Sequence, residues 1–125
     1  YLPKNGEMRQ LTHDHTHVGW LVRQGKLTAV QARHHPQKSL LQRALGGKVN
    51  SVEPDVGWVD YSSGDRFLLC SDGVTDSLSD RVIDDMLCDP SPRLKDMFPA
   101  KRLVQEAVDG ASRDNCTALV VELGM

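Results

Sequence analysis

The stretch R-F-L-L-C-S-D-G-V-T-D, from Arg66 to Asp76, decides how the rest of the chain is interpreted. Its apolar residues 67–70 predict a buried strand, and the S-D-G that follows predicts a tight turn into a short helical segment. A carboxylate held at a strand end suits Mg²⁺ or Mn²⁺, because hard cations prefer oxygen donors. Taken alone, the segment favours a plainer interpretation, in which Asp72 accepts backbone N–H groups within the turn.

A second polar cluster, S-R-D-N at residues 112–115, comes directly before another predicted strand. That strand, predicted over residues 116–123, is rich in β-branched and apolar residues. Asp114 therefore also lies at the edge of a strand, and the residues between Asp72 and Asp114 have a mostly helical pattern. We expect two adjacent strands to carry both aspartates to one cleft.

The two clusters together, L-L-C-S-D-G-V-T-D and S-R-D-N-C-T-A-L-V-V, resemble the last two signature motifs of the metal-dependent protein phosphatases. This is the protein phosphatase 2C-like, or PPM, family. Three further features agree in order: Q-L-T-H-D-H at residues 10–15, H-P followed by L-L-Q-R-A-L-G within 35–46, and S-G-D at 63–65. The resemblance implies the C-terminal half of an α/β/β/α sandwich. The order of predicted elements by itself indicates an α+β fold, with helices on a mostly antiparallel sheet.

The resemblance implies a protein serine/threonine phosphatase that uses two or more Mn²⁺ or Mg²⁺ ions. In the family, these ions activate water for attack on the phosphorus of a phosphoserine or phosphothreonine in a protein substrate. By motif match, Asp72 and Asp114 would be direct metal ligands, and Gly73 and Asn115 would support them. No catalytic residue is identified beyond the metal ligands. Asp76 is expected to cap the following helix.

Half of the family's site has no counterpart here, since neither an R-x-x-N-E-D nor a D-G-x-G-G segment occurs. The chain opens at Tyr1 in what reads as half of a hairpin with an Asn5-Gly6 turn, so we interpret it as a fragment. We expect little or no activity from it alone, and we consider the missing N-terminal half or a kinase as partners. The alternative is a non-catalytic phosphatase-like binding or regulatory module, in which both aspartates serve only as turn acceptors.

Composition sets further limits on the class of protein. The 125 residues, 39% of them hydrophobic, suffice for one domain or part of one. A net charge of −2 argues against a nucleic-acid partner, and no apolar run is long enough for a membrane span. Three cysteines, Cys70, Cys88 and Cys116, form no C-x-x-C pair and are predicted to be small core residues. We therefore expect a soluble protein of the reducing cytoplasm.

The order of patterns predicts one partial phosphatase domain with five parts: a hairpin over 1–11, a helical flap-like insertion over 12–47, strands and the metal turn over 48–78, helices over 79–111, and the last motif and strand over 112–125. Two S/T-x-x-Q capping boxes, at Thr28 and Ser39, predict helices within the insertion. Strands are predicted over 49–52 and 56–61, the second forming a hairpin with 67–70. A last helix over 100–109 is expected to bury Leu103, Val104, Ala107 and Val108.

A rival metal site must be considered at His13, His15 and His17, which share one face if the segment is extended. Three imidazoles on one face could hold Zn²⁺ or another transition metal. No further ligand pattern follows, and a helix starting near His17 would separate the three rings. Solvated surface histidines are therefore the favoured interpretation.

Overall fold

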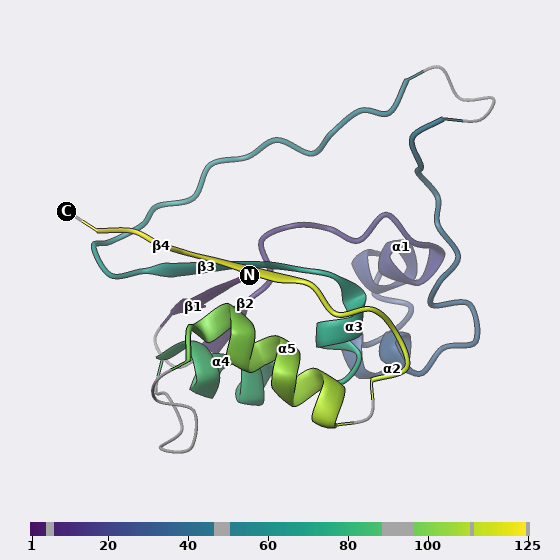
Figure 1. The fold of residues 1–125 in the computed structure, drawn as a ribbon. Coiled ribbons are helices and arrows are strands. Elements are labelled where there is room, and N and C mark those ends of the chain that lie inside the picture. Colours follow the sequence, from purple (N-terminus) through teal and green to yellow (C-terminus); the bar gives the residue numbers. More distant parts are fainter. Residues whose placement is uncertain (5–6, 47–50, 89–96, 111, 125) are drawn as a thin grey trace. The chain divides into compact units, whose positions relative to one another are not determined.

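The computed structural model describes residues 1–4, 7–46, 51–88, 97–110 and 112–124 (Figure 1). It divides into two compact units. The first, called the sheet unit here, comprises Tyr1–Leu11 and Val59–Met125; the second, called the insert unit, comprises Thr12–Trp58. Both units contain parts of the predicted phosphatase motifs, and each is considered by itself below.

The sheet unit contains two antiparallel strand pairs. Strand β1 (Leu2–Lys4) pairs with β2 (Glu7–Arg9), which confirms the predicted N-terminal hairpin; its turn lies outside the described residues. Strand β3 (Arg66–Cys70) pairs with β4 (Ala118–Glu122), with Leu68 opposite Val120. The backbone of Tyr1 joins the edge of β3, since its carbonyl accepts from the Leu68 N–H at 2.9 Å.

Among the described residues between β3 and β4, the chain forms α3 (Asp72–Thr75), α4 (Asp80–Cys88) and α5 (Pro99–Asp109). Helices α4 and α5 lie on one side of the β3–β4 pair (Figure 1). Ser79 caps α4, because its Oγ accepts from the backbone N–H of Val82 at 3.4 Å. Proline at the start of α5 fits a position where no N–H is needed.

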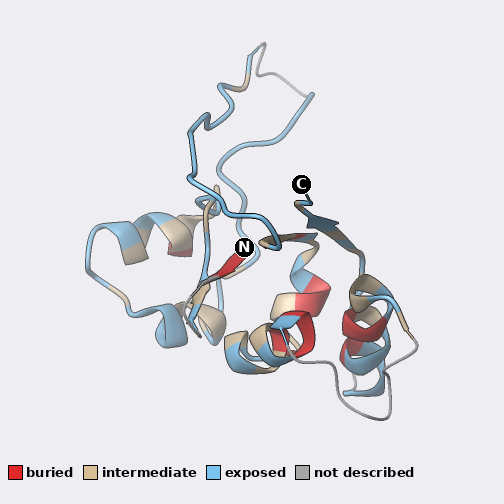
Figure 2. Ribbon diagram, turned by 90° about the vertical axis from the view of Figure 1, so that its left-hand side faces the viewer, coloured by how far each residue is buried: buried red, intermediate tan, exposed pale blue. Residues whose placement is uncertain are grey.

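The hydrophobic core of the sheet unit lies between these helices and β3 (Figure 2). Its buried residues are Leu68, Val74, Leu78, Ile83, Met86, Leu87, Leu103 and Ala107. The prediction for α5 was wrong at Val108, whose side chain is 54% exposed, whereas Arg102 is 2% exposed. The aliphatic stem of Arg102 packs inside, and its Nη2 donates to the Met86 carbonyl at 2.7 Å near the end of α4. The carbonyl near the end of α4 thus holds Arg102 in the core, although the sequence pattern of α5 alone predicts an exposed arginine.

The described residues of the insert unit form two short helices. Helix α1 (His17–Arg23) is capped by Thr16, whose Oγ accepts from the Gly19 N–H at 3.0 Å. The chain leaves it through Gly25, whose φ of 68° suits glycine. Helix α2 (Ala29–Arg33) has the complete capping box predicted at Thr28. The Thr28 N–H donates to the Gln31 Oε1 at 2.8 Å, and the Gln31 N–H donates to the Thr28 Oγ at 3.2 Å. Among the described residues of this unit, only Val18 is buried.

Two local predictions were wrong because long-range partners control the backbone there. Ser39 starts no helix; instead Leu41 forms a bridge with Thr16, and the Gln42 N–H donates to the His15 carbonyl at 2.8 Å. Residues 51–65 contain no strand, and 49–50 lie outside the described residues. The predicted hairpin between 56–61 and β3 is therefore absent, and β3 pairs with β4. A segment with strand propensity forms a strand only where another backbone supplies hydrogen bonds.

The cysteines and the helices bear on two further expectations. Cys70 and Cys116 are partly buried beside the core, but Cys88 is exposed at the end of α4, so its prediction as a core residue was wrong. None of the three forms a disulfide with another described residue. Across the described residues, no helix is both long and apolar enough to cross a bilayer.

Candidate metal site

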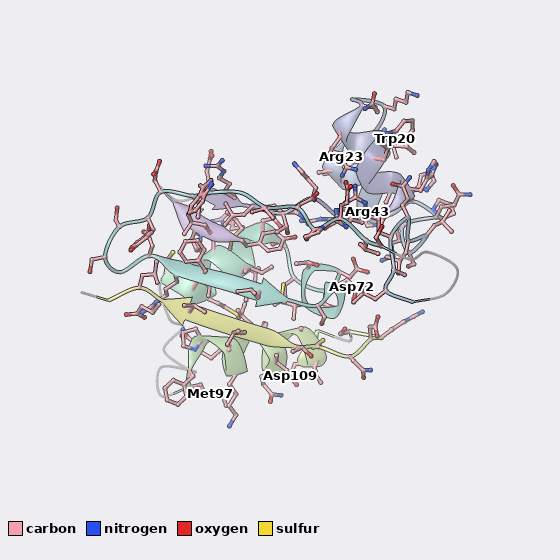
Figure 3. All side chains as sticks on the ribbon, turned by 90° about the horizontal axis from the view of Figure 1, so that it is seen from above. Trp20, Arg23, Arg43, Asp72, Met97 and Asp109 are labelled. Carbon is pink, nitrogen blue, oxygen red and sulfur yellow. The ribbon has the colours of Figure 1, made fainter. Side chains whose placement is uncertain are left out.

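The pairing of β3 with β4 brings the two aspartate turns to the same end of the sheet. Cys70, the last residue of β3, lies opposite Ala118, the first residue of β4. Because the strands are antiparallel, the turn after β3 and the segment before β4 are neighbours. Asp72 opens α3 directly beyond the end of β3 (Figure 3), and Asp114 belongs to the segment that enters β4. The predicted adjacency of the two aspartate-bearing strands is confirmed.

Two serine hydroxyls tie these segments together. The Ser71 Oγ donates to the Asn115 carbonyl at 3.1 Å and accepts from the Thr117 N–H at 3.0 Å. The Ser112 Oγ lies 3.1 Å from the Gly73 carbonyl, to which it donates. The backbone extends this connection, since the Ser71 N–H donates to the Thr117 carbonyl at 3.0 Å. Both aspartates therefore stand on segments whose spacing is fixed by hydrogen bonds.

Gly73 permits the close approach of the two segments. A Cβ atom at this buried position would collide with the backbone oxygen of Asn115 and lie 3.2 Å from the Cys116 Sγ. Any side chain at this position would therefore push the Asp114 segment away from α3. The motif's glycine and asparagine meet through their main chains.

The two carboxylates differ in their surroundings. Asp72 is exposed, and within the described part of the chain its carboxylate has no hydrogen bond or ion pair. Its backbone carbonyl accepts from the Asp76 N–H at 2.7 Å instead. The turn-acceptor interpretation of Asp72 therefore has no bond to support it. Asp114 is also exposed, but its Oδ1 accepts from the Asn115 N–H at 2.7 Å.

The donor atoms suit a hard divalent cation but supply only part of a site. Among the described residues, no group of three or more His, Cys, Asp or Glu side chains is placed to hold a metal. Mg²⁺ is often held by only one or two carboxylates together with water and phosphate oxygens, because it gives up water reluctantly. The Asp72 and Asp114 carboxylates fit that partial role.

The histidines of the insert unit have other contacts. His15 Nε2 lies 2.7 Å from Asp55 Oδ2, and the His17 ring stacks on Trp20 at a centroid distance of 6.1 Å. His13 is exposed. The described residues thus contain no three-histidine cluster.

Sequence reasoning missed Ser112 and misplaced Asp76. Ser112 is a central residue of the turn, since its Oγ also accepts from the Asp114 N–H at 3.4 Å. A serine two residues before an aspartate is a common local backbone-binding pattern, which was a usable signal. Asp76 ends α3 and does not cap α4, which begins after Ser79.

Comparison with known proteins supports the resemblance seen in the motifs. No family model matches the chain. Serine/threonine protein phosphatase PstP of Mycobacterium tuberculosis is 41% identical over 123 residues, which cover 98% of this chain and 23% of PstP. Protein phosphatase PhpP of Streptococcus pneumoniae is 37% identical over 122 residues, covering 98% of this chain and 48% of PhpP.

Solved structures agree in fold. The crystal structure of Mycobacterium tuberculosis PstP matches with a TM-score of 0.82 over 100% of this chain and 51% of that chain, at 41% identity. The PPM Ser-Thr phosphatase MsPP from Mycobacterium smegmatis, in complex with cacodylate, matches with a TM-score of 0.83 over 99% of this chain and 51% of that chain, also at 41% identity.

By sequence and fold, the chain belongs to the PPM-type protein phosphatases. It matches the C-terminal part of the PPM fold. The chain spans about half the length of the solved PPM structures and less than half the length of the full-length relatives PstP and PhpP. The predicted α+β class is confirmed. A PstP catalytic domain in complex with two manganese ions also matches this PPM chain, at 37% identity and a TM-score of 0.78.

Proposed function

We propose that the chain supplies two metal ligands, Asp72 and Asp114, to a PPM-type protein serine/threonine phosphatase. The observation that carries this proposal is the exposed Asp72 carboxylate, which has no partner among the described residues and stands on a segment bonded to that of Asp114. A partnerless carboxylate on a rigid turn is available to a cation at little cost in reorganisation. PstP and MsPP are named serine/threonine phosphatases and PhpP is named a protein phosphatase, which supports a phosphoprotein substrate.

Each part of the turn has a role in this proposal. Divalent Mn²⁺ or Mg²⁺, when bound, supplies an activated water and neutralises charge on the phosphoryl group. Asp72 presents its oxygens directly, while Asp114 keeps Oδ2 available because Oδ1 is held by the Asn115 N–H. Gly73 and the two serines hold the distance between the carboxylates. The chain's own contribution is thus ligand placement.

We further propose that the chain is inactive alone and is completed by the missing N-terminal half of the parent domain. One face of the β3–β4 pair packs on the helices, whereas Leu69, Leu119 and Val121 on the opposite face are 57%, 56% and 39% exposed. An apolar sheet face of this kind needs a cover. We also propose a reducing cytoplasm as the compartment, because Cys70, Cys88 and Cys116 form no disulfide among the described residues.

The test is a Mn²⁺ titration of the chain by calorimetry, with Asp72→Ala and a control, Asp85→Asn, at an exposed carboxylate on α4. We expect weak binding, retained in Asp85→Asn and lost in Asp72→Ala, with no hydrolysis of a small phosphoester by the chain alone. Equal binding by all three variants would contradict the assignment of Asp72. Full hydrolysis by the chain alone would contradict the proposal that it needs its complement.

The second candidate is a non-catalytic phosphatase-like binding module, favoured by the bond from the Asn115 N–H to the Asp114 carboxylate. In that case Asp114 is a turn acceptor only. Asp114→Asn then changes stability without changing Mn²⁺ affinity. In the phosphatase proposal, the same substitution lowers Mn²⁺ affinity, so the calorimetric titration separates the two.

A further inference from the structure

The charges of this chain are separated along the sequence in a way that the phosphatase site does not use. All 17 acidic residues lie outside residues 15–52, which contain six of the 15 Lys and Arg residues and four of the five His residues. The net charge of the whole chain is only −2. A positively charged region therefore sits within an otherwise acidic protein, and such a region attracts anionic partners by long-range electrostatics.

Helix α1 gives this positive region an ordered surface. His17, Trp20 and Arg23 follow each other at intervals of three residues, so they line one side of α1. Figure 3 shows Trp20 and Arg23 projecting from this helix. Trp20 is 37% exposed, and Lys26 holds its Nζ 5.0 Å from the Trp20 ring centroid. These four residues are called the α1 stripe below.

The cations of the α1 stripe, Arg23 and Lys26, form no ion pair within the described part of the chain. The Arg23 side chain donates to the backbone carbonyl of Asp14 at 3.2 Å, and the Lys26 ammonium group lies over the Trp20 ring; neither cation pairs with a carboxylate among the described residues. Arg43, by contrast, lies 3.5 Å from the Asp55 carboxylate. Arg23 and Lys26 therefore keep their charge available to a carboxylate from another molecule.

We propose that the α1 stripe is a docking surface for an acidic peptide segment. The identification of that segment as part of the phosphoprotein substrate rests on the proposed function. Arg23 and Lys26 pair with Asp or Glu side chains, and the Trp20 ring packs against an apolar side chain between them. Tryptophan and arginine are the residues that most often dominate peptide and protein interfaces. The docking contact is separate from the phosphorylated residue, so it selects substrates by their acidic flanks.

A nucleic acid is a weaker match for this surface. The positive charge is confined to one region, and the remainder of the chain carries all the acidic residues, which repel a long polyanion. A short acidic peptide needs only a few cations and one aromatic surface.

The test measures binding of a fluorescein-labelled, unphosphorylated peptide of alternating Glu and Leu residues by fluorescence anisotropy. The proteins are the full chain, the double variant Arg23→Glu/Lys26→Glu, and a control, Arg81→Glu/Lys101→Glu, which makes the same charge change at exposed positions on α4 and α5. We expect the stripe variant to lose about tenfold in affinity, about 1.4 kcal/mol, and the control to lose much less. Added salt should weaken binding to the unmodified chain, because exposed charges are screened.

Further variants separate this proposal from the proposed function. Asp72→Ala should bind the peptide as tightly as the unmodified chain, since no metal is involved. Trp20→Ala should weaken binding, whereas Trp58→Ala, at a fully exposed tryptophan, should not. Three results would each overturn the proposal: no binding to the chain at millimolar peptide, equal losses in the stripe and control variants, or tighter binding of a single-stranded RNA of equal length.

Discussion

The sheet unit and the insert unit are stabilised in different ways. In the sheet unit, α3, α4 and α5 bury a continuous apolar cluster against β3, including fully buried Ile83 and Leu103. In the described part of the insert unit only Val18 is buried, while Val30 is 69% exposed and Trp58 fully exposed. Caps and polar contacts define the insert unit instead. Burial of apolar side chains thus stabilises one unit, whereas helix caps and polar contacts, some of them between residues far apart in the chain, define the other.

The largest effect should come from the core of the sheet unit. Leu103→Ala should lower the free energy of unfolding by about 2–5 kcal/mol, because it removes a fully buried side chain and leaves a cavity. Val30→Ala, at an exposed position in the insert unit, should change it by less than about 0.5 kcal/mol. Urea denaturation followed by circular dichroism measures both. Similar decreases in the free energy of unfolding in the two variants would contradict the difference proposed between the units.

The aspartate turn should show the next largest effect. Gly73→Ala should cost about 1–3 kcal/mol, because the new methyl group collides with the Asn115 backbone and separates the two segments. Gly57→Ala is the matched control, since nothing lies within 4 Å of its Cβ position. Thermal unfolding measures the stability of each variant. Unchanged stability in Gly73→Ala would show that the turn is looser than its contacts indicate.

A smaller, local effect is expected at the capping box of α2. Thr28→Ala should destabilise α2 by about 1 kcal/mol, because the Gln31 N–H loses its acceptor. Ser39→Ala, in the second S/T-x-x-Q pattern, should have no such effect, because no helix forms there. Amide hydrogen exchange at Gln31 and Gln42 checks both. Faster exchange at Gln42 in Ser39→Ala would mean that the second box forms in solution.

The smallest effect should come from an exposed carboxylate of the insert unit. The hydrogen bond with His15 holds the pKa of Asp55 below its usual value. A carboxyl group whose pKa is lower in the folded state adds stability above its unfolded pKa, and this is lost as the pH falls through the folded pKa. NMR titration of the Asp55 carboxyl carbon should show the lowered pKa, and His15→Ala should reduce the shift, leaving the smaller effect of Arg43. Since Asp55 is exposed, a large acid-induced loss of stability that is absent from Asp55→Asn would contradict this picture.

Parts of the candidate site could be predicted from sequence, and parts could not. Asp72 and Asp114 were found because each follows or precedes an apolar strand, and the adjacency of those strands was inferred correctly. Their roles as metal ligands stay predictions. The contact of Gly73 with Asn115 could not be found, because it joins residues far apart in the chain. The bond from Ser112 to the Gly73 carbonyl could not be found for the same reason, although the local bond from the Asp114 N–H to Ser112 had a signal in the sequence.

The sequence by itself determined the elements whose signals are local. Periodic apolar residues and caps specify α1, α2, α4, most of α5 and the two central strands, because neighbouring residues carry both the pattern and the hydrogen bonds. Only the tertiary structure decided that Arg102 enters the core and that Gly73 lies against the Asn115 backbone. It also left residues 51–65 without a strand. In each of these cases the partner group comes from a distant part of the chain, and the local pattern carries no record of which partner that is.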